Sequence, residues 1–291
     1  MTSGILNIHK PSGVTSRRVV DQVQRLQRRL KAGHAGTLDP LASGVLVVCV
    51  GAATRLIEFV QQMPKQYEAT FLLGRESPTE DIEGDVRLLD NPPVPTLAQI
   101  DAAASALTGR IMQRPPAYSA LKLGGRRAYD LARRGEEVDL APRPVDVYRI
   151  EVTAYDYPTL GLRIDCGSGT YVRSLGRDLA ERLGSAAVMA SLVRTAIGDF
   201  RLEDALLPEE LTPDNWHDRL LPPLRAVAHL PHITVTADEA TRLRNGQSIA
   251  QRSVGDPPSL AAIDANEQLI AIVEPRDGRI APVRTFPMTE G

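Results

Sequence analysis

The alternation of apolar and polar positions predicts a chain of mixed strands and helices. Apolar residues recur at three- and four-residue steps over residues 19–30, which predicts an amphipathic helix capped by Ser16 with its arginines facing outward. Residues 44–51 form a short β-branched apolar run, typical of a strand buried on both faces, and a helix is expected over residues 52–62. Residues 67–73 alternate in polarity, which predicts a strand with one apolar face.

A second strand and helix are predicted further along the chain. Residues 162–166 alternate in polarity, and the glycine-rich turn at residues 167–169 leads into a helix whose apolar side begins at Val172. This order can hold a phosphate group, but Val172 occupies the place of the third glycine of a dinucleotide motif and the Walker lysine is missing. We therefore reject both nucleotide motifs.

The last quarter of the chain has the pattern of a small module. Two prolines at residues 222–223 mark a linker, and a strand at residues 233–235 follows. A short helix capped by Thr236 comes next, and then a hairpin of strands at residues 260–264 and 269–274. These elements predict a compact, β-rich module of roughly 60 residues.

Composition indicates a globular protein, with 43% apolar and 24% charged residues. Lys10 and Pro11 stand where a signal peptide needs its apolar core, and no apolar run reaches the ~18 residues of a membrane span, so we expect a cytoplasmic location. Cys49 and Cys166 lie in apolar runs and are interpreted as buried thiols. The net charge of −2 weighs against a nucleic-acid ligand, but residues 1–60 are locally basic.

Two segments are interpreted as insertions between these elements. Residues 74–97 are acidic and rich in proline and glycine, which indicates a surface excursion. The acids from Asp81 to Asp85 do not form a calcium loop, because Gly84 is not at the sixth loop position, and no histidine or cysteine spacing suggests zinc. Residues 109–149 mix basic and aromatic residues, which suits an arm lying on nucleic acid and equally a solvated insertion.

The candidate chemistry lies in residues 33–44, GHAGTLDPLASG. Taken alone, Asp39 before Pro40 in a glycine-rich stretch is an ordinary turn aspartate. The segment, however, closely resembles the active-site motif GHxGxLDPxAxG of the TruB pseudouridine synthases, in which the aspartate is the nucleophile. Further family segments follow in the family's order over residues 4–200: KPxG at Lys10, Pro11 and Gly13; KQYEATFLLG at residues 65–74; YSALK at residues 118–122; RP at Arg143 and Pro144; and GTYVRSL at residues 169–175.

The resemblance implies isomerisation of uridine to pseudouridine without a cofactor or metal. Asp39 is then the catalytic residue, acting by attack on the sugar, attack on the base or removal of a sugar proton. The resemblance also implies substrate-binding roles: Tyr67 stacks on the flipped uracil, Arg173 pairs with Asp39, Leu192 lines the pocket, His34 enters the RNA loop, and Tyr171 contacts substrate. Pattern alone explains Tyr67 and Leu192 as core residues, Arg173 as a phosphate contact or a surface charge on its helix, and His34 as a structural hydrogen-bonding group.

We therefore predict an α+β pseudouridine synthase domain over residues 1–228, with a mixed or antiparallel sheet flanked by helices and loops and an RNA-gripping insertion at about 109–149. A PUA-like β domain, resembling an RNA-binding module, follows at residues 229–291. The expected substrate is the T-arm uridine of tRNA, position 55 by family analogy. Residues 41–43 resemble the stand-alone bacterial form rather than the dyskerin relatives, which implies a monomer without a guide RNA or membrane partner. A non-catalytic tRNA chaperone and an N-glycosidase are the alternative hypotheses.

Overall fold

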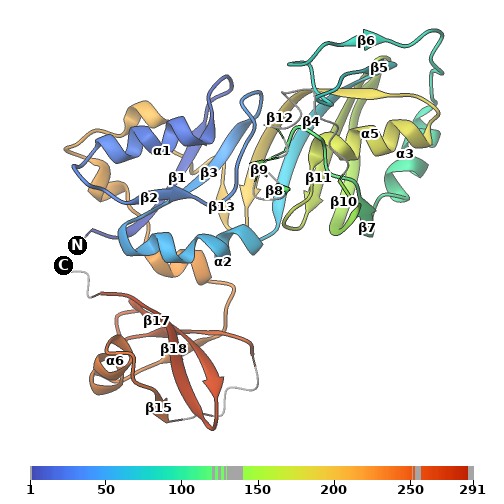
Figure 1. Ribbon diagram of the computed structural model, residues 1–291. Coiled ribbons are helices and arrows are strands. Elements are labelled where there is room, and N and C mark those ends of the chain that lie inside the picture. The colour runs from blue at the N-terminus through green and yellow to red at the C-terminus, as the bar shows by residue number, and fades with distance from the viewer. Residues whose placement is uncertain are drawn as a thin grey trace. The chain divides into compact units, whose positions relative to one another are not determined.

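The computed structural model describes residues 2–119, 122–123, 126–127, 129, 140–250, 252 and 257–287 (Figure 1). The chain forms two compact units. Unit 1 comprises Met1–Pro40, Val45–Gln62 and Glu203–Gly291, and unit 2 comprises Leu41–Gly44 and Met63–Leu202. No helix in the described residues is long and apolar enough to cross a membrane.

Unit 1 is built around β1 (Gly4–Lys10) and β3 (Ser43–Val50), which are hydrogen-bonded neighbours. β2 (Ala32–His34) pairs with β3 in antiparallel fashion. β3 is buried from Gly44 to its end, which confirms the predicted strand with two covered faces. β1 was not predicted, because its sequence GILNIHK does not alternate in polarity.

Helix α1 (Ser16–Arg25) confirms the predicted amphipathic helix, with Val19, Val20 and Val23 in the core of unit 1, but it ends at Arg25 and not at residue 30 as predicted. Its cap differs from the prediction, because the Thr15 side chain accepts the hydrogen bond from the Arg18 amide. The predicted helix over residues 52–62 is divided into a 3₁₀ helix, η1 (Gly51–Leu56), and α2 (Ile57–Gln62). Three more 3₁₀ turns complete this part of unit 1: η2 (Pro208–Glu210), η3 (Trp216–Arg219) and η4 (Pro223–Val227).

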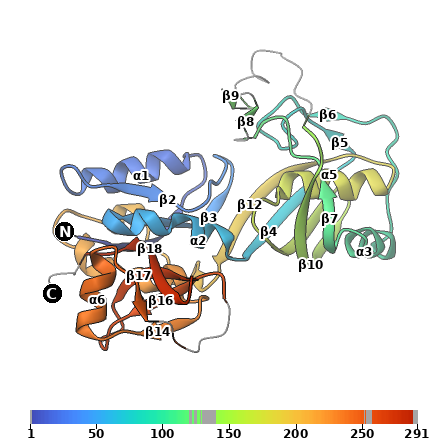
Figure 2. The same cartoon turned by 60° about the horizontal axis from the view of Figure 1, so that its bottom comes forward.

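The C-terminal segment of unit 1 has a sheet and a core of its own (Figure 2). The hydrogen-bonded order of its strands is β14 (His232–Thr234), β16 (Leu260–Ile263), β17 (Leu269–Arg276), β18 (Arg279–Thr285) and β15 (Ile249–Ala250). Helix α6 (Ala237–Arg244) begins with a reciprocal capping box of Thr236 and Glu239. The predicted module is therefore present, with β15 and β18 in addition to the predicted strands.

Unit 2 is a curved sheet with the strand order β12, β4, β11, β10, β7. These strands are β12 (Ala187–Ile197), β4 (Lys65–Leu73), β11 (Thr159–Cys166), β10 (Arg143–Asp156) and β7 (Gly109–Gln113). Neighbours are antiparallel, while Ser43 and Gly44 at the start of β3 pair in parallel with β12. β13 (Phe200–Arg201) pairs with the last residues of β12 on the edge opposite β4. The mixed sheet of the predicted α+β class is thus confirmed.

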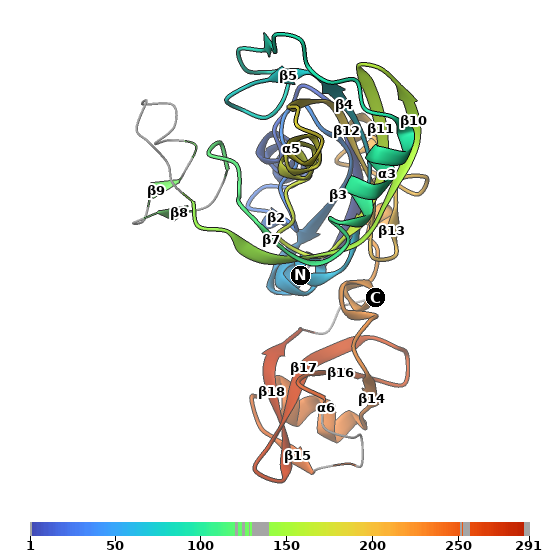
Figure 3. The same cartoon turned by 90° about the vertical axis from the view of Figure 1, so that its right-hand side faces the viewer.

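Helix α5 (Val172–Arg182) lies inside the curve of this sheet (Figure 3). It packs against β12 and β4, and a Cβ atom on Gly176 would lie 2.0 Å from Cε1 of Phe71. In β4 the side chains of Tyr67, Ala69, Phe71 and Leu73 share one buried face, because strand side chains alternate. Helix α5 therefore covers the face of β4 that carries Tyr67.

The two predicted insertions also belong to unit 2. The first carries a small ladder of β5 (Arg75–Glu76) and β6 (Arg87–Leu88) and is followed by α3 (Leu97–Ser105). The second contains β8 (Lys122–Leu123) paired with β9 (Arg126–Arg127). Residues 120–121, 124–125, 128 and 130–139 of the predicted RNA-gripping arm lie outside the described residues.

Candidate active site

Asp39 is half-buried and lies in a loop of unit 1. The backbone of the preceding residue, Leu38, is held by the side chain of the buried Ser16. The Ser16 hydroxyl donates to the Leu38 carbonyl oxygen at 3.0 Å and accepts from the Leu38 amide at 2.8 Å. Ser16, expected as a helix cap, thus holds the residue that precedes the candidate nucleophile. These two bonds fix both the carbonyl oxygen and the amide of Leu38, and so restrict the backbone that enters Asp39.

The following peptide unit is fixed by the KPxG element. The Gly13 amide donates to the Pro40 carbonyl at 2.7 Å, and the Lys10 ammonium lies 3.5 Å from the same oxygen. Lys10 is completely buried, and its ammonium also donates to the carbonyl oxygens of Pro11 and Val14 at 2.9 and 2.7 Å. Two motifs recognised separately in the sequence therefore form one structural unit around Asp39.

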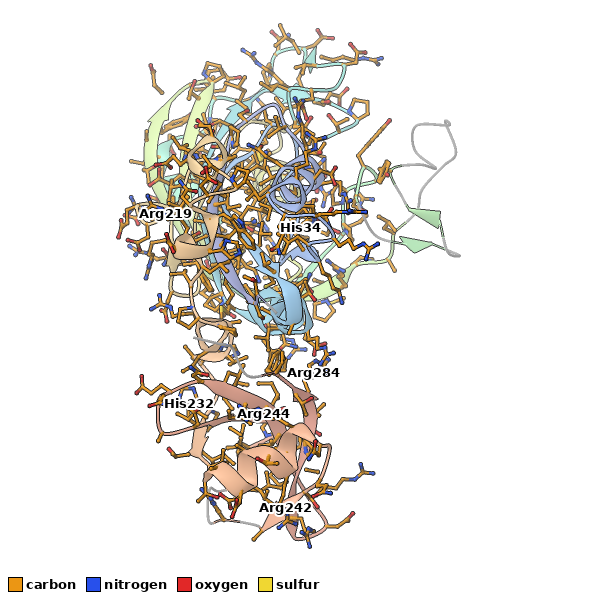
Figure 4. The ribbon with its side chains drawn as sticks, turned by 90° about the vertical axis from the view of Figure 1, so that its left-hand side faces the viewer. His34, Arg219, His232, Arg242, Arg244 and Arg284 are labelled. Atoms are coloured by element: carbon orange, nitrogen blue, oxygen red, sulfur yellow. The ribbon has the colours of Figure 1, made fainter. Side chains whose placement is uncertain are left out.

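Gly44, the last residue of the Asp39 motif, has φ +107°. A Cβ atom there would lie 2.3 Å from the backbone oxygen of Arg194. Only glycine satisfies both requirements, so this position is set by the close approach of β3 and β12. His34 lies in β2 opposite Val48 and is half-buried (Figure 4).

Unit 2 places three side chains of interest on one face of its sheet. Tyr67 in β4 is the Cα partner of Arg194 in β12, and Ala69 is the partner of Leu192. Partners on antiparallel strands point to the same face, so Tyr67, Leu192 and Arg194 are neighbours there. Tyr67 and Leu192 retain 8% and 7% exposure, whereas Arg194 retains 2%.

Sequence reasoning missed Arg194. It is a single cation within the apolar strand AVMASLVRTAI, and alternation places it on the same side as Leu192. Burial of a guanidinium costs free energy unless the group is paired with an acceptor or binds a ligand. A lone arginine within an apolar strand was therefore the feature of the sequence that could have identified Arg194 as a site residue.

Arg173 lies one turn before Gly176 on α5 and is 6% exposed. Its guanidinium donates to the carbonyl oxygens of Thr79 and Tyr118 at 2.6 and 2.9 Å and lies 3.5 Å from the carboxylate of Asp81. Asp81 is itself 4% exposed. The segment interpreted as a surface excursion thus contributes a buried acid, because Arg173 supplies the charge that makes its burial tolerable.

A second ion pair fixes the same excursion to α5. Arg177 pairs with Glu80 and also donates to the carbonyl of Arg114 at 2.8 Å, while the Ser174 hydroxyl donates to Glu80 at 2.8 Å. Burial raises the pKa of Glu80, and the charge of Arg177 opposes this increase. The excursion and the start of the second insertion are both anchored to the helix that carries Arg173.

Tyr171 immediately precedes α5, and Gln113 holds its backbone. The backbone amide of Tyr171 donates to the side-chain oxygen of Gln113 at 2.9 Å, and the side-chain NH₂ group of Gln113 donates to the Tyr171 carbonyl oxygen at 3.1 Å. Gln113 is 1% exposed. The Arg143 guanidinium lies 5.2 Å from the centre of the Tyr171 ring and donates to the Gly169 carbonyl at 2.6 Å. The RP element and the GTYVRSL segment are therefore in direct contact.

Three other buried titratable groups are Lys65, at the start of β4, Cys49 in β3 and Cys166 in β11. The Lys65 ammonium donates to the Met63 carbonyl at 2.6 Å. Burial, reinforced by the charge of Arg194, lowers the pKa of Lys65 to about 8. Cys49 and Cys166 are free and buried, as predicted, and burial raises their pKa values to about 12 and about 11.

The structure thus gathers Tyr67, Leu192 and the helix bearing Arg173 on one face of unit 2. Asp39 and His34 belong to unit 1. Asp81, Arg194 and Gln113 are additional members of the site that sequence reasoning did not identify.

Comparison with known proteins gives two family matches. Residues 24–172 match the family described as TruB family pseudouridylate synthase (N terminal domain), and residues 230–287 match tRNA Pseudouridine synthase II, C terminal. The chain is 40% identical over 288 residues to a tRNA pseudouridine synthase B of Dehalococcoides mccartyi, covering 97% of this chain and 96% of the relative. It is 43% identical over 256 residues to the protein of that name from Geobacillus kaustophilus, covering 84% of this chain and 89% of the relative.

A solved structure with a similar fold is the crystal structure of a Cbf5–Nop10–Gar1 complex, 27% identical in sequence. The structural match covers 93% of this chain and 78% of the matched chain in that complex, with a TM-score of 0.73.

Proposed function

Because this chain belongs to the TruB family of pseudouridylate synthases, we propose that it converts a uridine of tRNA to pseudouridine. The observation that carries this proposal is about 40% identity, over nearly the full chain, to proteins named tRNA pseudouridine synthase B. The finer proposals are the T-arm uridine at position 55, a cytoplasmic location and action as a monomer without a guide RNA. The last of these is supported by residues 41–43, which resemble the stand-alone bacterial form.

The reaction breaks the bond between the anomeric carbon and N1 of uracil and joins the same carbon to C5. C5 loses a proton and N1 gains one, so there is no net oxidation or reduction. We propose Asp39 as the group that begins this exchange, by attack on the sugar, attack on the base or removal of a sugar proton. Each route needs an ionised carboxylate in a fixed position, and the hydrogen bonds to Leu38 and Pro40 hold the backbone on either side of Asp39.

We further propose that residues of unit 2 act on the same uridine as Asp39. The chain connection between Asp39 and β3 supports this proposal. Asp39 is four residues before Ser43, and Ser43 is the Cα partner of Val193 in β12. Val193 lies between Leu192 and Arg194 in the same strand. Four residues of chain span at most about 14 Å. A guanidinium from Arg173 or Arg194 near the carboxylate would favour its charged form.

Tyr67 and Leu192 have the character needed to hold an everted base. A uracil removed from its stack needs an aromatic platform and an apolar wall. Tyr67 supplies the ring and Leu192 the wall, both nearly buried on the sheet face that carries Arg194 and is covered by the helix bearing Arg173. We propose that His34 and Tyr171 contact the surrounding RNA.

Release of tritium from tRNA labelled at C5 of uracil tests the proposal. The expected result is release by the wild-type protein and no measurable release by Asp39→Asn, with tRNA binding retained. Asp21→Asn is a matched control, since Asp21 is a partly exposed aspartate on α1 that pairs with Arg17. Normal turnover by Asp39→Asn would overturn the assignment of the nucleophile.

The same assay separates the alternatives. A protein that only refolds tRNA would keep its full effect in Asp39→Asn, whereas an N-glycosidase would release free uracil, which chromatography detects.

A further inference from the structure

A strongly basic groove lies in unit 1, and Asp39 and the other residues of the proposed active site are not among its lining residues. It is a hollow of about 610 Å³, and its charged lining residues in the described part of the chain are all cations: Arg28, Arg29, Lys31, Arg55 and Arg244. We call this site the basic groove. It stands out in a chain whose net charge is −2, because the excess positive charge is local.

The cations of the basic groove are not neutralised by the protein. Among the described residues, none of the five has an acidic group within 4 Å. The Arg244 Nε atom is buried without a hydrogen-bond partner, and the Arg55 guanidinium donates only to the Thr285 carbonyl at 2.9 Å. By contrast, Arg284 on strand β18, labelled in Figure 4, forms an ion pair with Glu58. A cluster of unpaired cations repels itself unless it binds an anion.

The cations of the basic groove come from three segments: the turn that follows α1, the 3₁₀ helix η1 and the end of α6. Arg29 has φ +62° in the turn that follows α1, and the Gly51 amide donates to the Lys31 carbonyl at 2.8 Å, which joins this turn to η1. Arg244 is the last residue of α6. The basic groove therefore uses residues from both matched segments, 24–172 and 230–287.

The basic groove is distant from the Asp39 segment. That segment leads into the N-terminal end of β3 at Gly44, whereas Gly51 at the other end of β3 lines the groove. Seven residues of extended strand span about 23 Å. At ~3.4 Å per pair, the spacing of B-form DNA, this length is about seven base pairs, and an A-form RNA duplex, which rises less per pair, needs more than that. A short RNA hairpin whose target base lies at Asp39 is therefore too short to extend to the basic groove. Only the parts of a longer RNA that lie outside this hairpin can contact the groove.

We propose that the basic groove binds the phosphate backbone of tRNA beyond the hairpin that carries the target uridine. The inference rests on the proposed function, which makes tRNA the substrate. Phosphate is the fitting ligand, because several cations without acids or exposed aromatic rings recognise charge rather than bases. Phe286 in the lining is 4% exposed and so offers no stacking surface.

The test uses the paired variant Arg28→Glu with Lys31→Glu. Both side chains are exposed and make no hydrogen bond in the described structure, so folding is expected to be unaffected. Binding is measured by fluorescence anisotropy for full-length tRNA and for a hairpin of about five base pairs over a series of salt concentrations. Arg219→Glu with Arg225→Glu is the control, because these exposed arginines of the same unit lie outside the groove and change the net charge equally.

The expected result is at least about tenfold weaker binding of tRNA at 0.1 M salt and a salt slope smaller by about two. Hairpin binding and both control measurements should stay within about twofold of wild type. Unchanged tRNA binding, or an equal loss for tRNA and hairpin, would overturn the proposal. Tritium release from the hairpin by wild-type protein is the separate readout: its failure would count against the proposed function, while the binding comparison still decides the role of the groove.

Discussion

Replacing Gly176 by alanine tests whether close packing of α5 on the sheet positions the site. A Cβ atom at residue 176 would lie 2.0, 2.3 and 2.7 Å from three ring atoms of Phe71. Ordinary contacts begin at 3.4 Å, so helix and ring must separate by about 1.4 Å, the difference between 3.4 and 2.0 Å. Phe71 is 1% exposed, which leaves its ring little room to withdraw.

The expected cost follows from two opposing effects. Overpacking of this kind costs about 1–3 kcal/mol, while alanine in place of glycine inside a helix gains about 1 kcal/mol. We expect Gly176→Ala to lose up to about 2 kcal/mol in the free energy of unfolding, the overpacking cost less the helix gain. Because Arg173 lies one turn earlier on the same helix, a shift near 1 Å should also lower single-turnover tritium release by about 100-fold.

Urea denaturation followed by circular dichroism measures the first effect, and a double-mutant cycle identifies its cause. Phe71→Leu removes the ring atoms that clash, so Gly176→Ala should cost less in that background than in the wild-type protein. Equal stability and equal turnover of Gly176→Ala and wild type would refute the argument, as would strict additivity of the two changes.

Two more predictions concern buried groups near the site. Between pH 8 and about 10.5 unfolded chains keep the Lys65 proton that the folded protein has released, so the contribution of Lys65 to stability should rise with pH by up to about 3 kcal/mol, while Cys49 and Cys166, whose pKa values are raised, oppose this rise above about pH 9 in wild type and variant alike. Lys65→Met should remove this rise in urea midpoints measured from pH 7 to 10, and an identical pH slope in both proteins would contradict the burial of the charge. Gly44→Ala should cost about 3 kcal/mol or more, because it adds φ strain to a clash with the Arg194 backbone. A thermal midpoint within 2 °C of wild type, at roughly 2–4 °C per kcal/mol, would count against that reasoning.

Several parts of this protein were determined by local sequence alone. The apolar run of β3, the alternation in β4 and β11, the helical periodicity of α1 and α5 and the capping box of α6 were predicted and are present. Each depends on residues close in sequence, because the period of the apolar positions fixes which face a strand or helix buries. The Asp39 motif was found for the same reason, since its twelve residues are consecutive.

The remaining features depend on partners distant in sequence, and only the tertiary structure decided them. β1, β10 and β12 were not predicted from a period of apolar positions, and their places in the sheet are set by hydrogen bonds to strands elsewhere in the chain. Asp81 was assigned to the surface because its cation, Arg173, is 92 residues away. The burial of a charged side chain depends on what surrounds it in space, and a list of neighbours along the chain does not contain that information.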